Sequence, residues 1–294
     1  MTSRLVRALA VGAGVVLTLV VLVAAAVYVR SALVLRRTYD VPLVPVAVPA
    51  DTAALAEGAR LAATRGCTGC HGERLEGRVF FEEPGVARLV APNLTRAVRE
   101  YSDAELARVI RHGVRRDGTS VFAMPSATFA GLSDADLGRL IAYLRSVPPA
   151  DGPGYELTIG PLGRFGLATG KFTPVAAGID HAAVGRDGAT PRATGPGGRA
   201  LPQSPKVLGR YVAHTACVEC HGAELRGGPR TRAPSLAAVV ARYSVAEFAT
   251  LLRTGVTSGG REVGLMSDMA RRRYVHLTDD EILGLYLYLR SLKP

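Results

Sequence analysis

The chain has 294 residues, of which 48% are hydrophobic and 6% aromatic, with no tryptophan and a formal net charge of +11. This length is enough for one large domain or for two ordinary domains joined by a linker. We find no zinc-finger, RNP or helix-turn-helix pattern and no basic run interleaved with aromatic residues, so nucleic acid is not expected as a partner. The positive charge is interpreted as a solvated basic surface, and a rim that docks an acidic protein partner is the functional alternative.

The N-terminal segment predicts a membrane anchor. Residues 8–29, ALAVGAGVVLTLVVLVAAAVYV, form an uncharged run that is long enough to cross a bilayer as a helix. A cleaved signal peptide normally has a shorter apolar region, so we expect the anchor to be retained, although the small residues 24–26 keep cleavage open. Arginines flank both ends of the run, so the positive-inside rule gives no orientation.

Most of the remaining chain is duplicated. GCTGCHGERLEG from Gly66 matches ACVECHGAELRG from Ala216, and two further pairs of segments follow in the same order, at offsets that differ by only a few residues. Such self-similarity indicates a repeated domain with small changes in the loops. We therefore expect five parts: an anchor (8–29), an extended spacer that holds the first domain off the membrane (30–50), a first domain (51–150), a Gly/Pro-rich linker (151–202) and a second domain (203–294).

Each copy is predicted to contain three helices, which makes the fold all-α. The first helix covers about 52–64, with Asp51 as its N-cap, and its counterpart covers about 206–214. The second and third helices are indicated by capping patterns, C-terminal glycines and apolar stripes. The residues that mark their ends are Ser102, Glu105, Gly113, Ser133 and Asp136 in the first copy, and Ser244, Glu247, Gly255, Thr278 and Glu281 in the second. No stretch alternates apolar and polar residues over a sustained length, so strands are not expected.

All four cysteines lie in two C-x-x-C-H runs, which carry the chemistry of this sequence. The runs are formed by Cys67, Cys70 and His71, and by Cys217, Cys220 and His221. Two thiols at this spacing can form thioethers with the vinyl groups of one haem, while the histidine that follows places an imidazole on the iron. A zinc ribbon would need both cysteine pairs in one small domain, and a thioredoxin-like pair expects a βαβ context. The sequence therefore predicts two haem c groups.

Methionines between the second and third helices are candidates for the sixth iron ligand. Met124 precedes a proline and belongs to no helical stripe, which favours a ligand over a core-filling role. The second copy offers Met266 and Met269. Met266 keeps the distance from the glycine after the second helix, whereas Met269 keeps the distance to the third helix. The repeat alone does not choose between them.

Both halves resemble class I cytochrome c domains, and the whole resembles a membrane-anchored di-haem cytochrome c, similar to the cytochrome subunits of bacterial alcohol, aldehyde and gluconate dehydrogenases. The resemblance covers residues 51–150 and 203–294 and is carried by CTGCH, CVECH, APNLT, RHGV, AMP and the two YLRS segments. It implies Met266 as the ligand in the second copy, although no proline follows that residue.

The resemblance also implies roles for residues around the haem ligands. The backbone carbonyls of Pro92 and Pro234 are expected to accept a hydrogen bond from the axial imidazoles. Gly58 and Gly209 are expected where the first helix of each copy crosses the last, with Tyr143 and Tyr288 packed nearby. The remaining histidines, His112, His181, His214 and His276, have no match in the other copy and are treated as ordinary polar residues.

These features predict an electron-transfer protein rather than an enzyme. Single electrons would pass between a dehydrogenase or quinol-side donor and an oxidase or soluble cytochrome. The alternatives are a di-haem peroxidase-like enzyme, with an open iron in the second copy, and a haem-based sensor. Because haem c attachment in bacteria is extracytoplasmic, we expect an inner-membrane protein with its haem domains on the periplasmic side.

Overall fold

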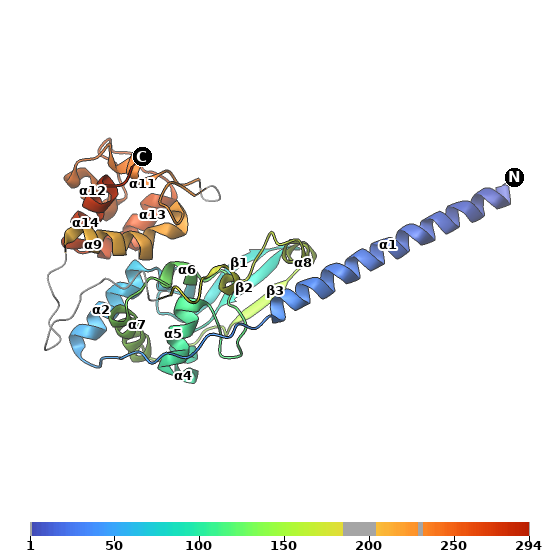
Figure 1. Cartoon of the computed structure of the whole chain (residues 1–294), viewed down its shortest axis with the longest axis horizontal. Helices are drawn as coiled ribbons and strands as arrows, with labels where there is room; N and C mark the ends of the chain where they lie inside the picture. Colours follow the sequence, from blue (N-terminus) through green and yellow to red (C-terminus); the bar gives the residue numbers. More distant parts are fainter. Residues whose placement is uncertain (1, 185–203, 229–231, 294) are drawn as a thin grey trace.

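The structure is a computed structural model that describes residues 2–184, 204–228 and 232–293. Helix α1 (Thr2–Arg36) projects away from the rest of the chain (Figure 1). Its segment Ser3–Arg36 reaches a mean hydropathy of 2.7 and buries none of its most apolar window, so it is long and apolar enough to cross a membrane.

The two copies are predominantly helical, in agreement with the predicted fold class. In both copies the first helix packs against the last, α2 on α7 and α9 on α14. The elements of the first copy are α2 (Thr52–Thr64), α3 (Cys67–His71), α4 (Leu94–Glu100), α5 (Asp103–His112), α6 (Ser126–Phe129) and α7 (Asp134–Ser146). Those of the second are α9 (Pro205–Val212), the π-helix η2 (Ala213–Cys217), α10 (Val218–His221), α11 (Leu236–Val240), α12 (Val245–Thr254), α13 (Leu265–Arg272), the 3₁₀-helix η3 (Tyr274–His276) and α14 (Asp279–Arg290).

The helix ends follow the capping signals of the sequence. The side chain of Asp51 accepts a hydrogen bond from the backbone N–H of Ala54 at the start of α2. The capping boxes predicted for α5, α12 and α14 are formed, and Gly113 and Gly255 end α5 and α12 with φ of 65° and 75°. A left-handed C-terminal residue is accessible to glycine at little cost, which explains why both helices stop at that residue.

The crossing of first and last helices depends on glycine in both copies. A Cβ on Gly58 would lie 2.1 Å from the carbonyl oxygen of Arg139 and 2.7 Å from Cβ of Tyr143. A Cβ on Gly209 would lie 1.9 Å from the carbonyl oxygen of Gly284. The backbones therefore approach more closely than any side chain would permit, as the resemblance to cytochrome c domains implied for these two positions.

The described residues form two large hydrophobic cores and a small third cluster of Val41, Val114 and Ala176, and one of the large cores draws on both copies. The core of the first copy includes Ala62, Leu106 and Ile141. The core of the second copy includes Val212, Leu252 and Ile282. Tyr211, from α9 of the second copy, is 7% exposed and belongs to the core of the first.

The expectation of no strands is wrong. Strands β1 (Arg78–Glu83), β2 (Ala87–Ala91) and β3 (Glu156–Ile159) form an antiparallel sheet in the order β1-β2-β3. The strands are short, and every side chain of β1 is exposed, so no apolar alternation marks them. The third strand lies within the segment that was predicted to be a linker.

The segments before and after the first copy are also more ordered than expected. α1 continues to Arg36, so the extended segment begins only at residue 37. This segment packs along the first copy: Val41 is buried, and Arg108 donates a hydrogen bond to its carbonyl. The expected linker contains β3, α8 (Pro161–Ala168) and the 3₁₀-helix η1 (Val175–Gly178). Its residues 185–203 lie outside the described residues.

Candidate functional site

The first cysteine pair lies on the single helical turn α3. Gly66, at φ 77°, turns the chain from α2 into Cys67. Cys67 and Cys70 are both free thiols. Burial raises the pKa of Cys67 to about 11 and also raises the pKa of Cys70, so both remain protonated at neutral pH. The turn therefore presents two unpaired S–H groups next to His71.

The second pair is reached by a different backbone path. Ala216 occupies the position of Gly66, and an alanine is strained in the left-handed conformation. The chain instead passes from α9 through the π-helix η2 into Cys217 and α10. Cys217 and Cys220 are again not joined in a disulfide, and burial raises the pKa of Cys217 to about 12.

Both histidines of the motifs are oriented by a proline carbonyl. His71 Nδ1 lies 2.9 Å from the oxygen of Pro92, and His221 Nδ1 lies 2.8 Å from the oxygen of Pro234. A carbonyl can only accept, so Nδ1 carries the proton and Nε2 keeps its lone pair. Burial lowers the pKa of both imidazoles, which favours the neutral ring. Each ring is thus fixed as a neutral nitrogen ligand whose orientation is set by its hydrogen bond.

Met124 lies on the loop that leads into α6. Ala123, just before it, has a positive φ of 62°, and Ser126, just after it, is fully buried. The hydroxyl of Ser126 donates to the carbonyl of Val109 on α5, which fixes the loop against that helix. Met124 itself is half-buried and packs against the core of the first copy.

The second copy repeats this arrangement with a shift in register. The hydroxyl of the fully buried Ser267 donates to the carbonyl of Gly255 at the end of α12. Gly264, with φ 59°, stands two residues before Met266, whereas Ala123 stands directly before Met124. Met266 therefore stands just before the buried serine, whereas Met269 stands after it. Both methionines lie on α13 and pack against the second core.

The two motifs lie close together in space, which their separation in sequence conceals. The guanidinium of Arg273 packs on the backbone of Gly66, because a Cβ on that glycine would lie 2.0 Å from Nη2. Its Nη1 lies 3.0 Å from Oε2 of Glu219, between the second pair of cysteines. The positive charge of Arg273 acts on Cys70 of one motif and on Cys220 of the other.

Arg65 is a second cation at this junction. It is 2% exposed, lies 5.9 Å from the ring of Tyr211, and its charge acts on both Cys67 and Cys217. Its Nη1 donates to Thr64, but Nε and Nη2 have no hydrogen-bond partner within the described part of the chain. Buried N–H groups of a cation need an acceptor, and a haem carboxylate is chemically suited to that role.

Further contacts fix the two copies to each other. Tyr211 donates to Oδ2 of Asp136 at 2.7 Å and accepts from the backbone N–H of Ser133 at 3.3 Å. Arg60 forms a two-pronged ion pair with Glu281, with N–O distances of 2.6 and 2.9 Å. Because Glu281 also caps α14, this pair joins α2 of the first copy to the last helix of the second.

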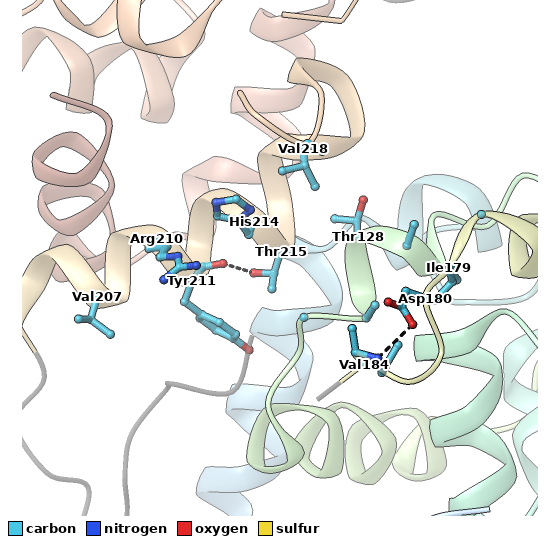
Figure 2. A pocket seen from close by; sticks show the side chains of 16 residues that line it. Thr128, Ile179, Asp180, Val184, Val207, Arg210, Tyr211, His214, Thr215 and Val218 are labelled. Atoms are coloured by element: carbon cyan, nitrogen blue, oxygen red, sulfur yellow. Dashed lines mark hydrogen bonds between the residues drawn. The ribbon is translucent and has the colours of Figure 1, made fainter. Parts of the chain in front are cut away.

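A cavity of about 450 Å³ lies beside these contacts, between α6, α9 and the residues that follow η1. Figure 2 shows Thr128, Asp180 and His214 at its walls, with the ring of Tyr211 directed toward the first copy. Its described lining includes no cysteine of the motifs, no motif histidine and no methionine. The lining does include Val218, between Cys217 and Cys220, so the cavity borders the second attachment motif.

Three of the other histidines, His112, His181 and His214, have side-chain partners nearby. His112 and His181 approach each other through their Nδ1 atoms at 3.1 Å, and burial, reinforced by His181, lowers the pKa of His112 to about 4. His214 Nε2 lies 3.0 Å from the hydroxyl of Tyr288. The repeat does not indicate these pairs, because neither has a counterpart in the other copy: Thr254 stands where the first copy has His112.

The donor set fits haem c. Each motif supplies two thiols outside any disulfide for thioether bonds and one neutral imidazole whose Nε2 keeps its lone pair, and methionine-bearing segments follow in both copies. Paired cysteines that served as a disulfide would be joined, and none of the four is.

Comparison with known proteins agrees with this chemistry. The cytochrome c family profile matches residues 55–148 and 207–293. The cytochrome c subunit of alcohol dehydrogenase (quinone) from Gluconacetobacter polyoxogenes is 29% identical over 273 residues, covering 83% of this chain and 57% of that protein. The fructose dehydrogenase cytochrome subunit of Gluconobacter japonicus is 26% identical, covering 85% and 55%, and the gluconate 2-dehydrogenase cytochrome c subunit of Pantoea cypripedii is 28% identical, covering 83% and 60%.

The chain thus spans little more than half the length of these relatives. The family match covers more than half of the chain, and each matched segment contains one C-x-x-C-H motif. The chain belongs to the cytochrome c family.

Proposed function

We propose that this chain is a membrane-anchored di-haem cytochrome c that passes single electrons from one haem site to the other. Family membership already gives covalently bound haem c and electron transfer. The number two rests on the repetition, because each copy has its own thiol pair and its own histidine bonded to a proline carbonyl. When bound, haem iron supplies a one-electron couple whose potential the axial ligands set.

The observation that carries the proposal is the position of Arg273. This one side chain contacts Gly66, directly before the first cysteine pair, and Glu219, inside the second. The two attachment motifs therefore lie on either side of a single guanidinium, so both haems would be bonded to neighbouring segments. Such closeness suits electron transfer within one chain.

We assign Met124 and Met266 as the axial sulfur ligands, together with His71 and His221. The support for Met266 is that it precedes a buried serine that bonds the preceding helix, as Met124 does, although Met266 is adjacent to Ser267 and Met124 is two residues before Ser126. Thioether ligation at both irons favours electron transfer at a raised potential over ligand binding.

The partners follow from the relatives. Their names describe cytochrome subunits of alcohol, fructose and gluconate dehydrogenases, so this chain would accept electrons from a dehydrogenase or a quinol-side donor. The acceptor would be an oxidase or a soluble cytochrome. Haem c attachment places residues after α1 on the periplasmic side of the inner membrane, with the N-terminus in the cytoplasm.

Haem counting tests the proposal. The full chain, produced with a haem c maturation system, should show two haems by pyridine haemochrome assay and intact mass. Cys67→Ser with Cys70→Ser should leave one haem, and so should Cys217→Ser with Cys220→Ser. A wild-type mass with a single haem would contradict the proposal.

A further inference from the structure

The sequence of helix α1 indicates at which depth in the membrane this helix meets the rest of the chain. An uncharged run of 22 residues, 8–29, lies between Arg7 and Arg30. At about 1.5 Å per residue this run matches the hydrocarbon thickness of roughly 30 Å. Tyr28 and Ser31 therefore stand at the boundary between hydrocarbon and headgroups, whatever moderate tilt the helix adopts.

Helix α8 is attached to α1 at that level. The guanidinium of Arg164 lies 4.7 Å from the centroid of the Tyr28 ring, and its Nη1 donates to the hydroxyl of Ser31 at 3.1 Å. Ser31 is fully buried by this contact. The two helices pack against each other, and Figure 1 shows α8 beside the base of the projecting helix. An element fixed to Tyr28 and Ser31 must itself lie at the membrane surface.

The same helix exposes large apolar side chains. Leu162 is 63% exposed and Phe165 is 50% exposed, and they are three residues apart, hence on one face. Phe172, which packs over Gly166, is 49% exposed. We call Leu162, Phe165 and Phe172 the juxtamembrane patch. Exposed apolar groups of this size on α8 and the turn that follows it mark an interaction surface.

The sheet that is bonded to the start of α8 also exposes apolar side chains. Strand β1 exposes Phe80 and Phe81 at 42% and 43%. The turn after β1 is bonded to the start of α8, because Leu162 N–H donates to the carbonyl of Gly85. The exposed Arg30, Arg36 and Lys171 lie close in sequence to these elements, and cations near a membrane surface attract anionic lipids.

We propose that the juxtamembrane patch inserts into the headgroup and acyl boundary of the bilayer beside α1, and so holds the first copy against the membrane. The lipid surface is the occupant because the patch is continuous with the membrane-spanning helix and fixed at its boundary. Short amphipathic segments with leucine and phenylalanine on one face bind membranes in this manner. The contact does not depend on the number of haems.

Lipid cross-linking tests the proposal. The full haem-loaded chain is placed in nanodiscs whose phospholipids carry a diazirine near the start of the acyl chain, illuminated, digested and analysed by mass spectrometry. Cross-links are expected on α1 and on residues 161–172. Leu283 and Leu287 on α14 are a matched control, since they are exposed to 41% and 40% but belong to the second copy, and they should carry none.

Two double variants sharpen the result. Leu162→Glu with Phe165→Glu should reduce cross-linking of residues 161–172 several-fold while α1 remains labelled. Leu283→Glu with Leu287→Glu should change nothing, and an unaltered haem spectrum shows that each variant is folded. Labelling of α1 without residues 161–172 in the wild-type chain overturns the proposal, as does cross-linking of that segment to another protein in native membranes instead of to lipid.

Discussion

The two copies keep the same support around the histidine and differ on the methionine side. In both, the first helix crosses the last at a glycine and a proline carbonyl fixes the imidazole. The distance along the chain from histidine to that proline is 21 residues in the first copy, which inserts β1 and β2, and 13 in the second. The methionine is followed by proline in one copy and starts α13 in the other. Duplication has thus preserved the attachment geometry while the sixth-ligand loops diverged, which predicts two different haem environments.

The helix crossing should give the largest effects. Gly58→Ala and Gly209→Ala each force a Cβ into a backbone carbonyl, and we expect a loss of unfolding free energy of about 3 kcal/mol or more. Gly209→Ala should cause the larger loss of unfolding free energy. Gly209 faces Gly284, where an added Cβ would also clash, so the backbones of α9 and α14 are closest at this point.

Denaturant unfolding of the haem-loaded chain measures these losses. Gly154→Ala is a matched control, since no atom lies within 4 Å of its Cβ position, and it should unfold like the wild type. Equal, small effects at all three sites would show that the crossings are not close-packed.

The methionines test the divergence itself. Met124→Ala should remove the sulfur-to-iron charge-transfer band of one haem and lower its potential, since thioether ligation raises it. Met266→Ala should do the same to the other haem, and Met269→Ala should leave both bands in place. Absorbance spectra measure the charge-transfer bands, and redox titration measures the two potentials. Loss of a band in the Met269 variant, with the band retained in the Met266 variant, would identify Met269 as the ligand.

Arg273 tests whether the copies act as a pair. Its positive charge lies next to both motifs and stabilises the reduced, less positive state of each iron. Arg273→Gln should lower both potentials, by less than the loss of a methionine ligand. Arg271→Gln removes an exposed arginine paired with Glu262 and serves as the control. A shift in only one potential would mean that the guanidinium serves one site alone.

The histidine pair should give the smallest effect. The pKa of His112 is about 4 in the folded chain, below its usual 6.5, because burial and His181 disfavour the charged ring. The unfolded chain therefore binds the proton first, and stability should fall as pH drops from about 6.5 to about 4. The second copy has Thr254 at the matching position. His112→Thr should therefore flatten the dependence of the denaturation midpoint on pH, and an unchanged slope would contradict this origin.

Local signals made much of this molecule predictable. Capping boxes at Ser102 and Ser244 and the C-terminal glycines placed α5 and α12, because such patterns act within one turn of helix. The spacing of the cysteines identified the cofactor class, because two thioether bonds to one ring require that spacing. The short strands and α8 were missed because neither produces a long apolar period.

Contacts between distant segments could not be predicted in this way. Nothing around Arg273 in the sequence indicates that it packs on Gly66, and nothing around Arg164 indicates that it meets Tyr28. Each such contact depends on how whole elements are placed. The sequence repeat shows that the two copies fold alike, but it carries no information on where one copy contacts the other.

Because Tyr211 of the second copy is inserted into the core of the first, the two copies are not independent domains. Its ring fills space among the side chains of the neighbouring copy, and its hydroxyl satisfies both the carboxylate of Asp136 and the N–H of Ser133. A gene fragment that encodes residues 51–150 alone would lose the aromatic ring that fills this space and one of the two side-chain donors to Asp136, with only Arg139 remaining. The duplicated halves have thus become a single unit for recombination and for engineering, and either half would need redesign at this joint before it could be transplanted.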